Sequence, residues 1–188
     1  MTGADVPSPE GANTEAGCFL RVATADGMVE LGRRLAGLLV AGDLVVLDGD
    51  LGAGKTTFTR GLGQALGVRG PVTSPTFVIA RQHPSTSGGP DLVHVDAYRL
   101  ASASDVDSLD LDDSMERSVT VVEWGRGRVE QLADSWLAVH IERDESDLES
   151  APEAVVDGDG VRLVRLSAHG PAWGARMASV HRVIGLLA

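Results

Sequence analysis

The sequence predicts an α/β fold, a three-layer sandwich in which helices flank a mixed, mostly parallel sheet, and three observations support it. Strand-like and helix-like patterns alternate along most of the 188 residues, as they do in α/β proteins. Residues 44–47 and 119–122 are continuous apolar runs, typical of central parallel strands buried on both faces. Strand patterns at 76–82 and 92–97 are joined by turn-forming residues 84–90, which predict a hairpin and hence an antiparallel pair.

The first part of the chain is predicted to hold a tail, a strand and a helix. Residues 1–17 are rich in Pro, Gly, Ala and Glu and lack apolar periodicity, so we expect a disordered tail before a single domain at 18–188. A short strand is expected at 19–23. Thr24 is a candidate N-cap for an amphipathic helix that we expect to end at Gly42.

A Gly-rich loop follows the first apolar run. Residues 49–54 precede a helical pattern at 55–66, which Gly67 closes. The segment from Gly49 to Thr56 matches G-x-x-x-x-G-K-[ST], the Walker A motif. A buried strand before the motif and a helix after it are the context that this motif requires. The sandwich is therefore predicted to be of the P-loop NTPase type, and a chance Gly-rich turn is the alternative.

The remaining patterns continue the alternation of helices and strands. In order, the expected elements are a helix capped by Ser102 or Ser104 that runs to about Met115, a buried strand at 119–123, a helix near 126–132, a strand at 136–141, an acidic loop at 143–159, a strand at 161–167 and a final helix from Ala172.

The Walker A pattern gives each of its residues a role toward ATP and Mg²⁺. Backbone N–H groups of the loop and of the following helix N-terminus point at phosphate oxygens. Lys55 is expected to contact the β and γ phosphates, Thr56 to ligate Mg²⁺ and Thr57 to contact the α phosphate. The other predicted nucleotide-binding residues are Asp50, Leu51, Gly52, Ala53 and Gly54 in the loop and Thr24 on the adenine side.

Lys55 is the only lysine among the 16 basic residues, and the others are arginines. Codon bias is the ordinary explanation for such a composition. Lysine remains where a compact ammonium fits a phosphate cradle and a planar guanidinium would not.

Composition limits the partners and the compartment. The net charge of −11 repels nucleic-acid backbones and no long basic run offsets it, so direct tRNA or DNA binding is not expected. The single cysteine, Cys18, excludes an intramolecular disulfide and a cysteine-based zinc site. No apolar run is long enough to cross a bilayer and no secretory signal pattern is present, so a cytoplasmic protein without membrane contact is expected.

Two strand ends offer carboxylates for a metal. Asp96 ends an apolar strand as a Walker B residue does, and it could hold Mg²⁺ directly or through water; pairing with Arg99 or helix capping is the alternative. Glu123 ends a buried strand, where a carboxylate needs a cation or donors. It is a candidate for binding Mg²⁺ or for orienting the attacking water, with an ion pair to an arginine as the alternative. Lys55, Asp96 and Glu123 are the predicted catalytic residues.

Residues near these carboxylates have both functional and structural interpretations. Thr73, Ser74 and Thr76 follow the Walker A helix, where a switch segment could sense the γ phosphate, and a turn fixed by Pro75 is the alternative. His94 is expected to form a structural hydrogen bond. Tyr98 and Arg99 could bind a partner, with ion pairing as the alternative for Arg99. Trp124 could pack in the core or contact a partner.

Four segments in order resemble the TsaE family, also called YjeE. They are the Walker A segment ending at Thr57, Val-Thr-Ser-Pro-Thr-Phe at 72–77, His-Val-Asp-Ala-Tyr-Arg-Leu at 94–100 and Val-Glu-Trp-Gly at 122–125, and Leu-Ser-Ala-His-Gly-Pro at 166–171 is similar to the family's last strand. The sequence departs from the family after the Glu-Trp pair, where Gly125-Arg126-Gly127 replaces a frequent acidic residue or proline.

The resemblance implies a function that composition and spacing do not show. TsaE-family proteins are the ATPase subunit for threonylcarbamoyl transfer to the tRNA adenosine beside the anticodon, and they act with TsaD and TsaB. The resemblance thus implies an ATPase that reaches tRNA only indirectly, through TsaD-type and TsaB-type proteins.

Two other functions are compatible with a Walker A motif in this sequence. A small-molecule kinase of the P-loop class would need an acceptor pocket and a lid with several arginines, and no such arginine cluster is evident. A nucleotide-dependent binding module with negligible turnover is the other. A GTPase is disfavoured because no Asn-Lys-x-Asp segment is present.

Overall fold

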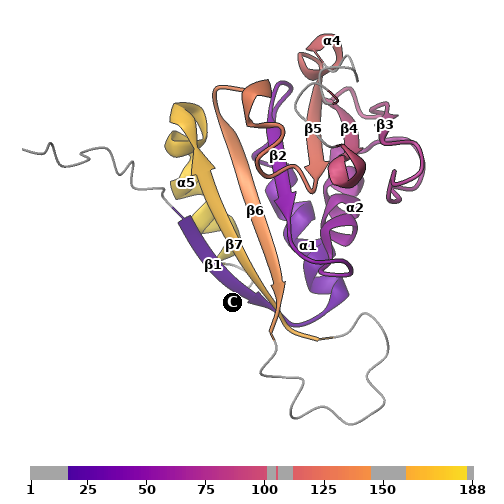
Figure 1. The fold of residues 1–188 in the computed structure, drawn as a ribbon. Helices are drawn as coiled ribbons and strands as arrows, with labels where there is room; N and C mark the ends of the chain where they lie inside the picture. Colours follow the sequence, from indigo (N-terminus) through magenta and orange to yellow (C-terminus); the bar gives the residue numbers. More distant parts are fainter. Residues whose placement is uncertain (1–16, 101–104, 106–111, 145–159, 186–188) are drawn as a thin grey trace, which may run out of the picture.

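The computed structural model describes residues 17–100, 105, 112–144 and 160–185, which form one mixed sheet with flanking helices (Figure 1). The strands are β1 (Gly17–Val22), β2 (Leu44–Asp48), β3 (Ala80–His83), β4 (Asp91–Asp96), β5 (Ser118–Glu123), β6 (Trp136–Arg143) and β7 (Arg162–His169). The helices are α1 (Ala25–Ala36), α2 (Lys55–Leu66), α4 (Asp112–Met115) and α5 (Gly170–Ile184), with short 3₁₀ helices η1 (Ala97–Arg99) and η2 (Glu130–Leu132). The strand order is β1-β7-β6-β2-β5-β4-β3.

The centre of the sheet is parallel and its two edges are antiparallel. Strands β4, β5, β2 and β6 pair in parallel. Strand β3 pairs antiparallel with β4, and the β6–β7–β1 edge is antiparallel as well. The predicted hairpin is therefore confirmed, with His83 opposite Leu92 at its closed end. The predicted α/β fold with a mixed, mostly parallel sheet is confirmed too.

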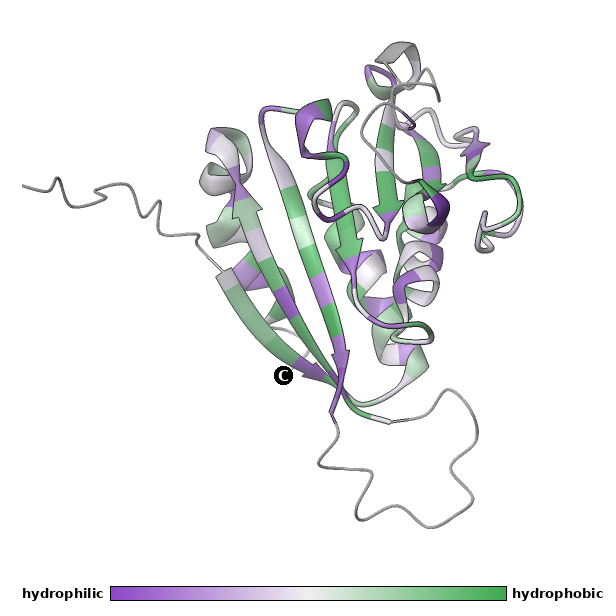
Figure 2. Cartoon of the chain, viewed as in Figure 1, coloured by the Kyte–Doolittle hydropathy of each residue, from purple (hydrophilic) through white to green (hydrophobic). Residues whose placement is uncertain are grey.

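Burial distinguishes the central strands from the antiparallel edge. Every residue of β5 is buried, whereas fully and partly buried residues alternate along most of β6. Figure 2 shows the same contrast, with hydrophobic colour along β2 and β5 and hydrophilic colour recurring along β6 and β7. Strands covered on both faces are continuous apolar runs, which is why residues 44–47 and 119–122 stood out in the sequence.

Two hydrophobic clusters lie on opposite faces of the sheet. Val45 and Val46 are neighbours in β2 and belong to different clusters, as the alternation of side chains along a strand requires. One cluster joins the sheet to α1, α2 and α5 and includes the fully buried Phe58 and Trp173. The other includes Met115 of α4, and the described elements that contribute to it outside the sheet are short. The helical layer is thus thick on one face and thin on the other.

Helices α1 and α2 approach each other through glycines. A Cβ atom on Gly32 of α1 would lie 2.2 Å from the Phe58 carbonyl oxygen, and one on Gly61 of α2 would lie 2.0 Å from the Val29 carbonyl oxygen. Neither position can hold a side chain without moving the backbone. Arg33 also donates a 2.8 Å hydrogen bond to Gln64 across the pair. Because α2 follows the Gly-rich loop, this contact fixes the loop's helix against α1.

Two helices are shorter than predicted. Helix α1 ends at Ala36, and Gly37 is its C-cap. Gly42, the predicted end, has φ +92° and donates its N–H to the Ser118 carbonyl, so it forms the turn into β2. The helix predicted at 126–132 is reduced to η2, because Gly127 has φ +75° and cannot continue a right-handed helix.

The strand predicted at 76–82 is also shorter, since β3 begins at Ala80. The N–H groups of Val78 and Ile79 both donate to the Pro75 carbonyl, which closes a turn where strand pairing was expected. Ile79 has φ +68°, outside the strand region. The Pro75 turn, named above as the alternative to a switch role for Thr73, Ser74 and Thr76, is therefore present.

Some predictions fall on parts of the chain that the structure does not describe. The cap at Ser102 or Ser104 and the tail at 1–16 lie outside the described residues, whereas Gly17, assigned to the tail, belongs to β1. None of the described helices combines the length and the apolar character needed to cross a lipid bilayer.

Candidate functional site

The Gly-rich loop joins the end of β2 to the start of α2 and leaves backbone N–H groups available. Gly49 has φ +137°, and a Cβ there would lie 2.1 Å from the Ile141 carbonyl oxygen. Gly54 has φ +116° and is the N-cap of α2, with no side chain capping the helix. The first N–H groups of a helix without a capping side chain are free to bind an anion. The positive φ at Gly49 and Gly54, together with the Ile141 carbonyl beside Gly49, therefore requires glycine at both positions.

This loop forms one wall of a cavity of about 480 Å³. Loop and α2 residues in its lining are Leu51, Gly52, Gly54, Lys55, Thr56 and Thr57, and the remaining lining residues are Ser74, Thr76, Asp96, Tyr98, Glu123 and Trp124. The cavity therefore contains most of the residues that the sequence predicts for the site, and its size is in the range of nucleotide and drug-sized ligands.

Lys55 is buried at the base of this cavity. Its Nζ donates to the carbonyls of Gly49 at 2.5 Å and Asp50 at 2.9 Å, and lies 3.7 Å from the centre of the Trp124 ring. Burial lowers the pKa of the Lys55 ammonium, while nearby carboxylates, Glu123 first among them, oppose that shift. Its hydrogen bonds go to neutral carbonyl groups and not to a carboxylate, so the ammonium charge can pair with an anionic ligand in the cavity.

The two candidate carboxylates lie side by side at the ends of neighbouring parallel strands. In the β4–β5 register, Asp96 is opposite Glu123. Glu123 Oε1 accepts the Thr56 hydroxyl at 2.7 Å and lies 2.8 Å from His94 Nε2. Both carboxylates are largely buried. The parallel strands thus bring together residues 27 positions apart in the sequence.

A second hydrogen-bonded chain runs from Asp96 into the predicted switch segment. Asp96 Oδ2 accepts the Thr76 hydroxyl at 2.6 Å, and the Thr76 hydroxyl lies 2.6 Å from the Ser74 hydroxyl. The other oxygen, Oδ1, accepts the Tyr98 N–H at 3.0 Å. Asp96 therefore also caps η1, and the structure connects it to two of the three predicted switch residues.

The donor atoms fit a hard divalent cation. The Thr56 hydroxyl and the carboxylates of Glu123 and Asp96 line the same cavity. Among the described residues no group of three His, Cys, Asp or Glu side chains could hold a metal by itself. Mg²⁺ is usually bound by one or two carboxylates together with substrate phosphates. Thr56, Glu123 and Asp96 are the residues that could hold it.

Two residues beside the cavity have strained backbones. Trp124 has φ +60° and Ile79 has φ +68°, although neither is glycine. Such conformations cost about 1–3 kcal/mol each and persist where the surroundings enforce them. Trp124 directly follows Glu123, and the Ile79 carbonyl accepts the N–H of Asp96 at 2.8 Å. Strain is therefore located next to both carboxylates.

A family model described as threonylcarbamoyl adenosine biosynthesis protein TsaE matches residues 22–151. The chain belongs to the TsaE family. It is 56% identical over 154 residues to the tRNA threonylcarbamoyladenosine biosynthesis protein TsaE of Streptomyces coelicolor, which covers 81% of this chain and 98% of that protein. The Mycobacterium tuberculosis protein of the same name is 52% identical over 120 residues, 60% of this chain and 71% of that protein.

A solved structure agrees with this family assignment. The crystal structure of YdiB of Bacillus subtilis superposes with a TM-score of 0.69 at 27% sequence identity, covering 91% of this chain and 98% of that chain. The resemblance identified in the sequence is thus confirmed, and the family places this TsaE-family chain in tRNA threonylcarbamoyladenosine biosynthesis.

Some predicted residues of this TsaE-family chain lie away from the cavity. The Thr24 hydroxyl accepts the Gly27 N–H at 3.0 Å as the cap of α1, and Thr24 does not line the cavity. Thr73 accepts a hydrogen bond from Arg81 rather than joining Ser74 and Thr76. The Arg99 guanidinium lies 5.9 Å from the Phe77 ring centre, not on Asp96. Of the two alternatives considered for Asp96, helix capping is therefore present, whereas pairing with Arg99 is not found among the described residues.

Two arginines that the sequence did not single out contact the loop from β6 and β7, on the side of β2 away from β5. Arg143 at the end of β6 donates to the Gly52 carbonyl at 3.2 Å, and the buried Arg162 at the start of β7 donates to the Ala53 carbonyl at 3.4 Å. These contacts hold two carbonyl groups of the loop from the β6–β7 side. An arginine at the end of the strand that pairs with β2 could have been predicted to contact the loop, but only with the strand order known.

Proposed function

We propose that this TsaE-family chain is a Mg²⁺-dependent, ATP-hydrolysing subunit that supports threonylcarbamoyl transfer to the tRNA adenosine next to the anticodon. The observation that carries the proposal is the position of Lys55. It begins α2 directly after the Gly-rich loop and lines the same cavity as Asp96 and Glu123. A cation at a helix N-terminus, facing two carboxylates, is the arrangement needed to bind a nucleotide phosphate chain with a divalent cation.

Four side chains of the cavity have parts in this reaction. Lys55 binds the β and γ phosphates, and the first N–H groups of α2 bind phosphate oxygens. Thr56 and Asp96 would hold Mg²⁺, and Glu123 would support the site through its hydrogen bond with Thr56. A bound Mg²⁺ would neutralise the charge that develops on the phosphate oxygens. Glu123 also accepts a hydrogen bond from the attacking water.

We further propose that the chain acts through TsaD-type and TsaB-type proteins in the cytoplasm and reaches tRNA only through them. Its net charge of −11 opposes direct binding to a phosphate backbone. The route from nucleotide to surface is the chain from Asp96 to Thr76 and Ser74, beside which the Phe77 side chain is 92% exposed. ATP would order this segment for docking and hydrolysis would release it.

Incubation with γ-labelled ATP tests the reaction. Release of free phosphate supports the ATPase, and addition of TsaB and TsaD should accelerate a slow basal rate. Label on a small acceptor molecule would instead indicate a P-loop kinase, and no turnover with or without the partners would indicate a nucleotide-binding module.

Binding titrations test the partner assignment. The purified chain should show no specific gel shift with tRNA at physiological salt, whereas its affinity for a TsaB–TsaD complex should differ between the ATP and ADP forms. Tight tRNA binding by the chain alone, or docking that ignores the nucleotide, contradicts this part of the proposal.

A further inference from the structure

One buried histidine on β4 contacts the candidate catalytic carboxylate directly. His94 is 0% exposed, and its Nε2 lies 2.8 Å from Glu123 Oε1. The same oxygen accepts the Thr56 hydroxyl at 2.7 Å. Among the described residues, the hydrogen bonds of the Glu123 side chain thus end on one oxygen. Glu123 lines the cavity, so Oε2 is the oxygen left for a ligand there.

Hydrogen-bond chemistry assigns the direction of this contact. A carboxylate only accepts hydrogen bonds, so His94 donates from Nε2–H and its Nδ1 is left as an acceptor. Nδ1 has no hydrogen-bond partner among the described residues. A buried polar atom without a partner is destabilising, and an aliphatic side chain would avoid that cost. Packing alone therefore explains this histidine poorly, whereas the contact with Glu123 explains it well.

The surroundings of His94 make the contact rigid. The ring lies on a central strand that pairs on both sides, and His94 is opposite Val121 of β5, two residues before Glu123. Val119, Val121 and Val122 of that strand are all fully buried. A ring held on one strand and a carboxylate held on the next leave little freedom for the Glu123 side chain. Such partners behind a functional group fix its orientation.

We propose that His94 is a positioning residue for γ-phosphate hydrolysis, which holds Glu123 so that Oε2 faces the attacking water. The inference rests on the proposed ATPase function. In that reaction the water oxygen bonds to the γ phosphorus and the bond to the β–γ bridging oxygen breaks. ADP leaves with that electron pair, and the proton of the water passes to the released phosphate. His94 touches none of the reacting atoms and acts only through Glu123.

The chain offers a matched control in a second buried histidine. His83 on β3 is 4% exposed, and its Nε2 also lacks a partner among the described residues. His83 does not line the cavity. Loss of either histidine should disturb packing to a similar degree, whereas only His94 contacts Glu123.

Steady-state ATP hydrolysis tests the proposal in the full chain, with thermal unfolding measured for every variant. His94→Leu should lower kcat by about 10- to 100-fold, as loss of a supporting contact does, with KM nearly unchanged. His94→Gln, whose amide can donate to Glu123, should recover most of the rate, and His94→Asn, whose amide is too short, should not. His83→Leu should keep kcat, whatever its effect on the unfolding temperature.

A double-mutant cycle separates action through Glu123 from a general effect. In a Glu123→Gln background, His94→Leu should lower kcat no further, because the two act as one unit. An equal and additive loss in both backgrounds, an unchanged kcat in His94→Leu, or the same loss in His83→Leu overturns the role of His94. If His94→Leu does not fold, the comparison of kcat between His94→Gln and His94→Asn tests the role of His94 instead. Absence of ATP hydrolysis by the wild-type chain with its partners overturns the proposed function itself.

Discussion

The two halves of the sheet distribute their polar residues differently. In the parallel half, β4 and β5 end at the same edge, so Asp96 and Glu123 lie side by side and both line the cavity. In the antiparallel half, strand ends alternate between edges. Its polar residues form separate local pairs, such as Arg21 of β1 with Asp144 at 2.8 Å. Parallel pairing therefore brings polar strand-end residues together at one edge, whereas antiparallel pairing places them at opposite edges.

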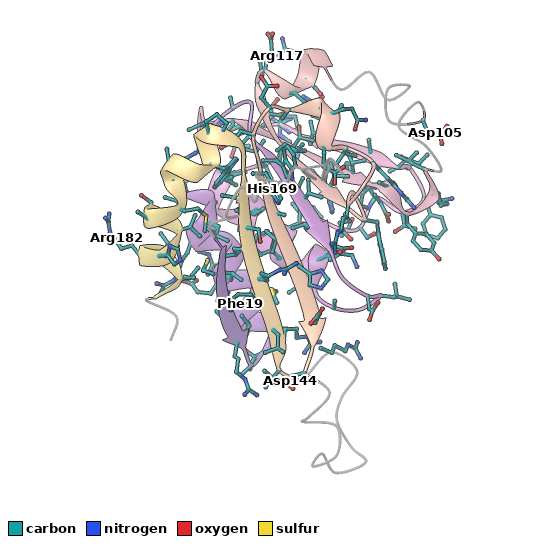
Figure 3. The ribbon with its side chains drawn as sticks, turned by 60° about the vertical axis from the view of Figure 1, so that its left-hand side comes forward. Phe19, Asp105, Arg117, Asp144, His169 and Arg182 are labelled. Carbon is teal, nitrogen blue, oxygen red and sulfur yellow. The ribbon has the colours of Figure 1, made fainter. Side chains whose placement is uncertain are left out.

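The two halves of the sheet also differ in how far their side chains are exposed to solvent. Figure 3 turns the β1–β7–β6 side forward, with Phe19 and His169 labelled on β1 and at the end of β7. Phe19 is 75% exposed, and the His169 ring stacks on Trp136 at 4.7 Å. The parallel half keeps its carboxylates buried and supplied with donors. This difference predicts that substitutions in the parallel half affect turnover and those on the outer face of the antiparallel half do not.

The largest expected effect is that of Lys55→Ala, which should abolish measurable ATP binding while the fold survives. Charge-assisted contacts contribute about 1.5–3 kcal/mol each, and loss of two of them weakens affinity on the order of 10²- to 10⁴-fold. Calorimetric titration with ATP measures the affinity of the variant and of the wild-type chain. The matched control is Arg165→Gln on the exposed face of β7, which should keep wild-type affinity. Undiminished affinity in Lys55→Ala would contradict the assignment of the loop.

The next effect is on turnover rather than on binding. Asp96→Asn and Glu123→Gln should each lower kcat by about 10²- to 10³-fold, as removal of groups that act in the transition state does. ATP affinity should change far less, because loop N–H groups and Lys55 provide the ground-state contacts. Phosphate release measures kcat and calorimetry measures ATP affinity, and both are carried out on the same preparations. Wild-type rates in both variants would rule out the roles assigned here.

A smaller effect concerns the helices behind the parallel half. Gly61→Ala should destabilise the protein by about 1–3 kcal/mol or more, because its Cβ would meet the Val29 carbonyl. In α5, Gly174→Ala meets no atom within 4 Å and should be neutral or stabilising by about 0.5–1 kcal/mol. Chemical denaturation measures both. Equal stability of the two variants would show that the α1–α2 approach is looser than described.

The smallest expected effect is a pH dependence due to His83. Burial lowers the pKa of His83 from its ordinary value of 6.5, with Arg81 and His94 acting in the same direction. The unfolded chain therefore takes up this proton at a higher pH than the folded protein does. Stability is present above about pH 6.5 and is lost as pH falls toward the folded pKa. Thermal unfolding of His83→Gln should lose less stability on acidification, and an identical loss in both proteins would contradict this.

Much of the parallel half was predictable from the sequence because local patterns determine it. Helix α2 has the predicted bounds, and Asp96 and Glu123 were expected at strand ends. The contacts of Arg143 and Arg162 with the loop were not, because β6 and β7 reach it through pairings that no local pattern encodes. The strand predicted at 76–82 was wrong in extent, because the Pro75 turn competes with strand propensity there.

The glycine contact between α1 and α2 has a mechanical consequence. With Gly32 against the Phe58 carbonyl and Gly61 against the Val29 carbonyl, neither helix can slide or roll on the other without a backbone collision. The start of α2 is thus held in register with α1, and the nucleotide signal proposed above is not expected to travel by sliding one helix along the other. We expect displacement instead on the cavity wall formed by Ser74 and Thr76, whose hydrogen bonds to Asp96 and to each other run through side-chain hydroxyls.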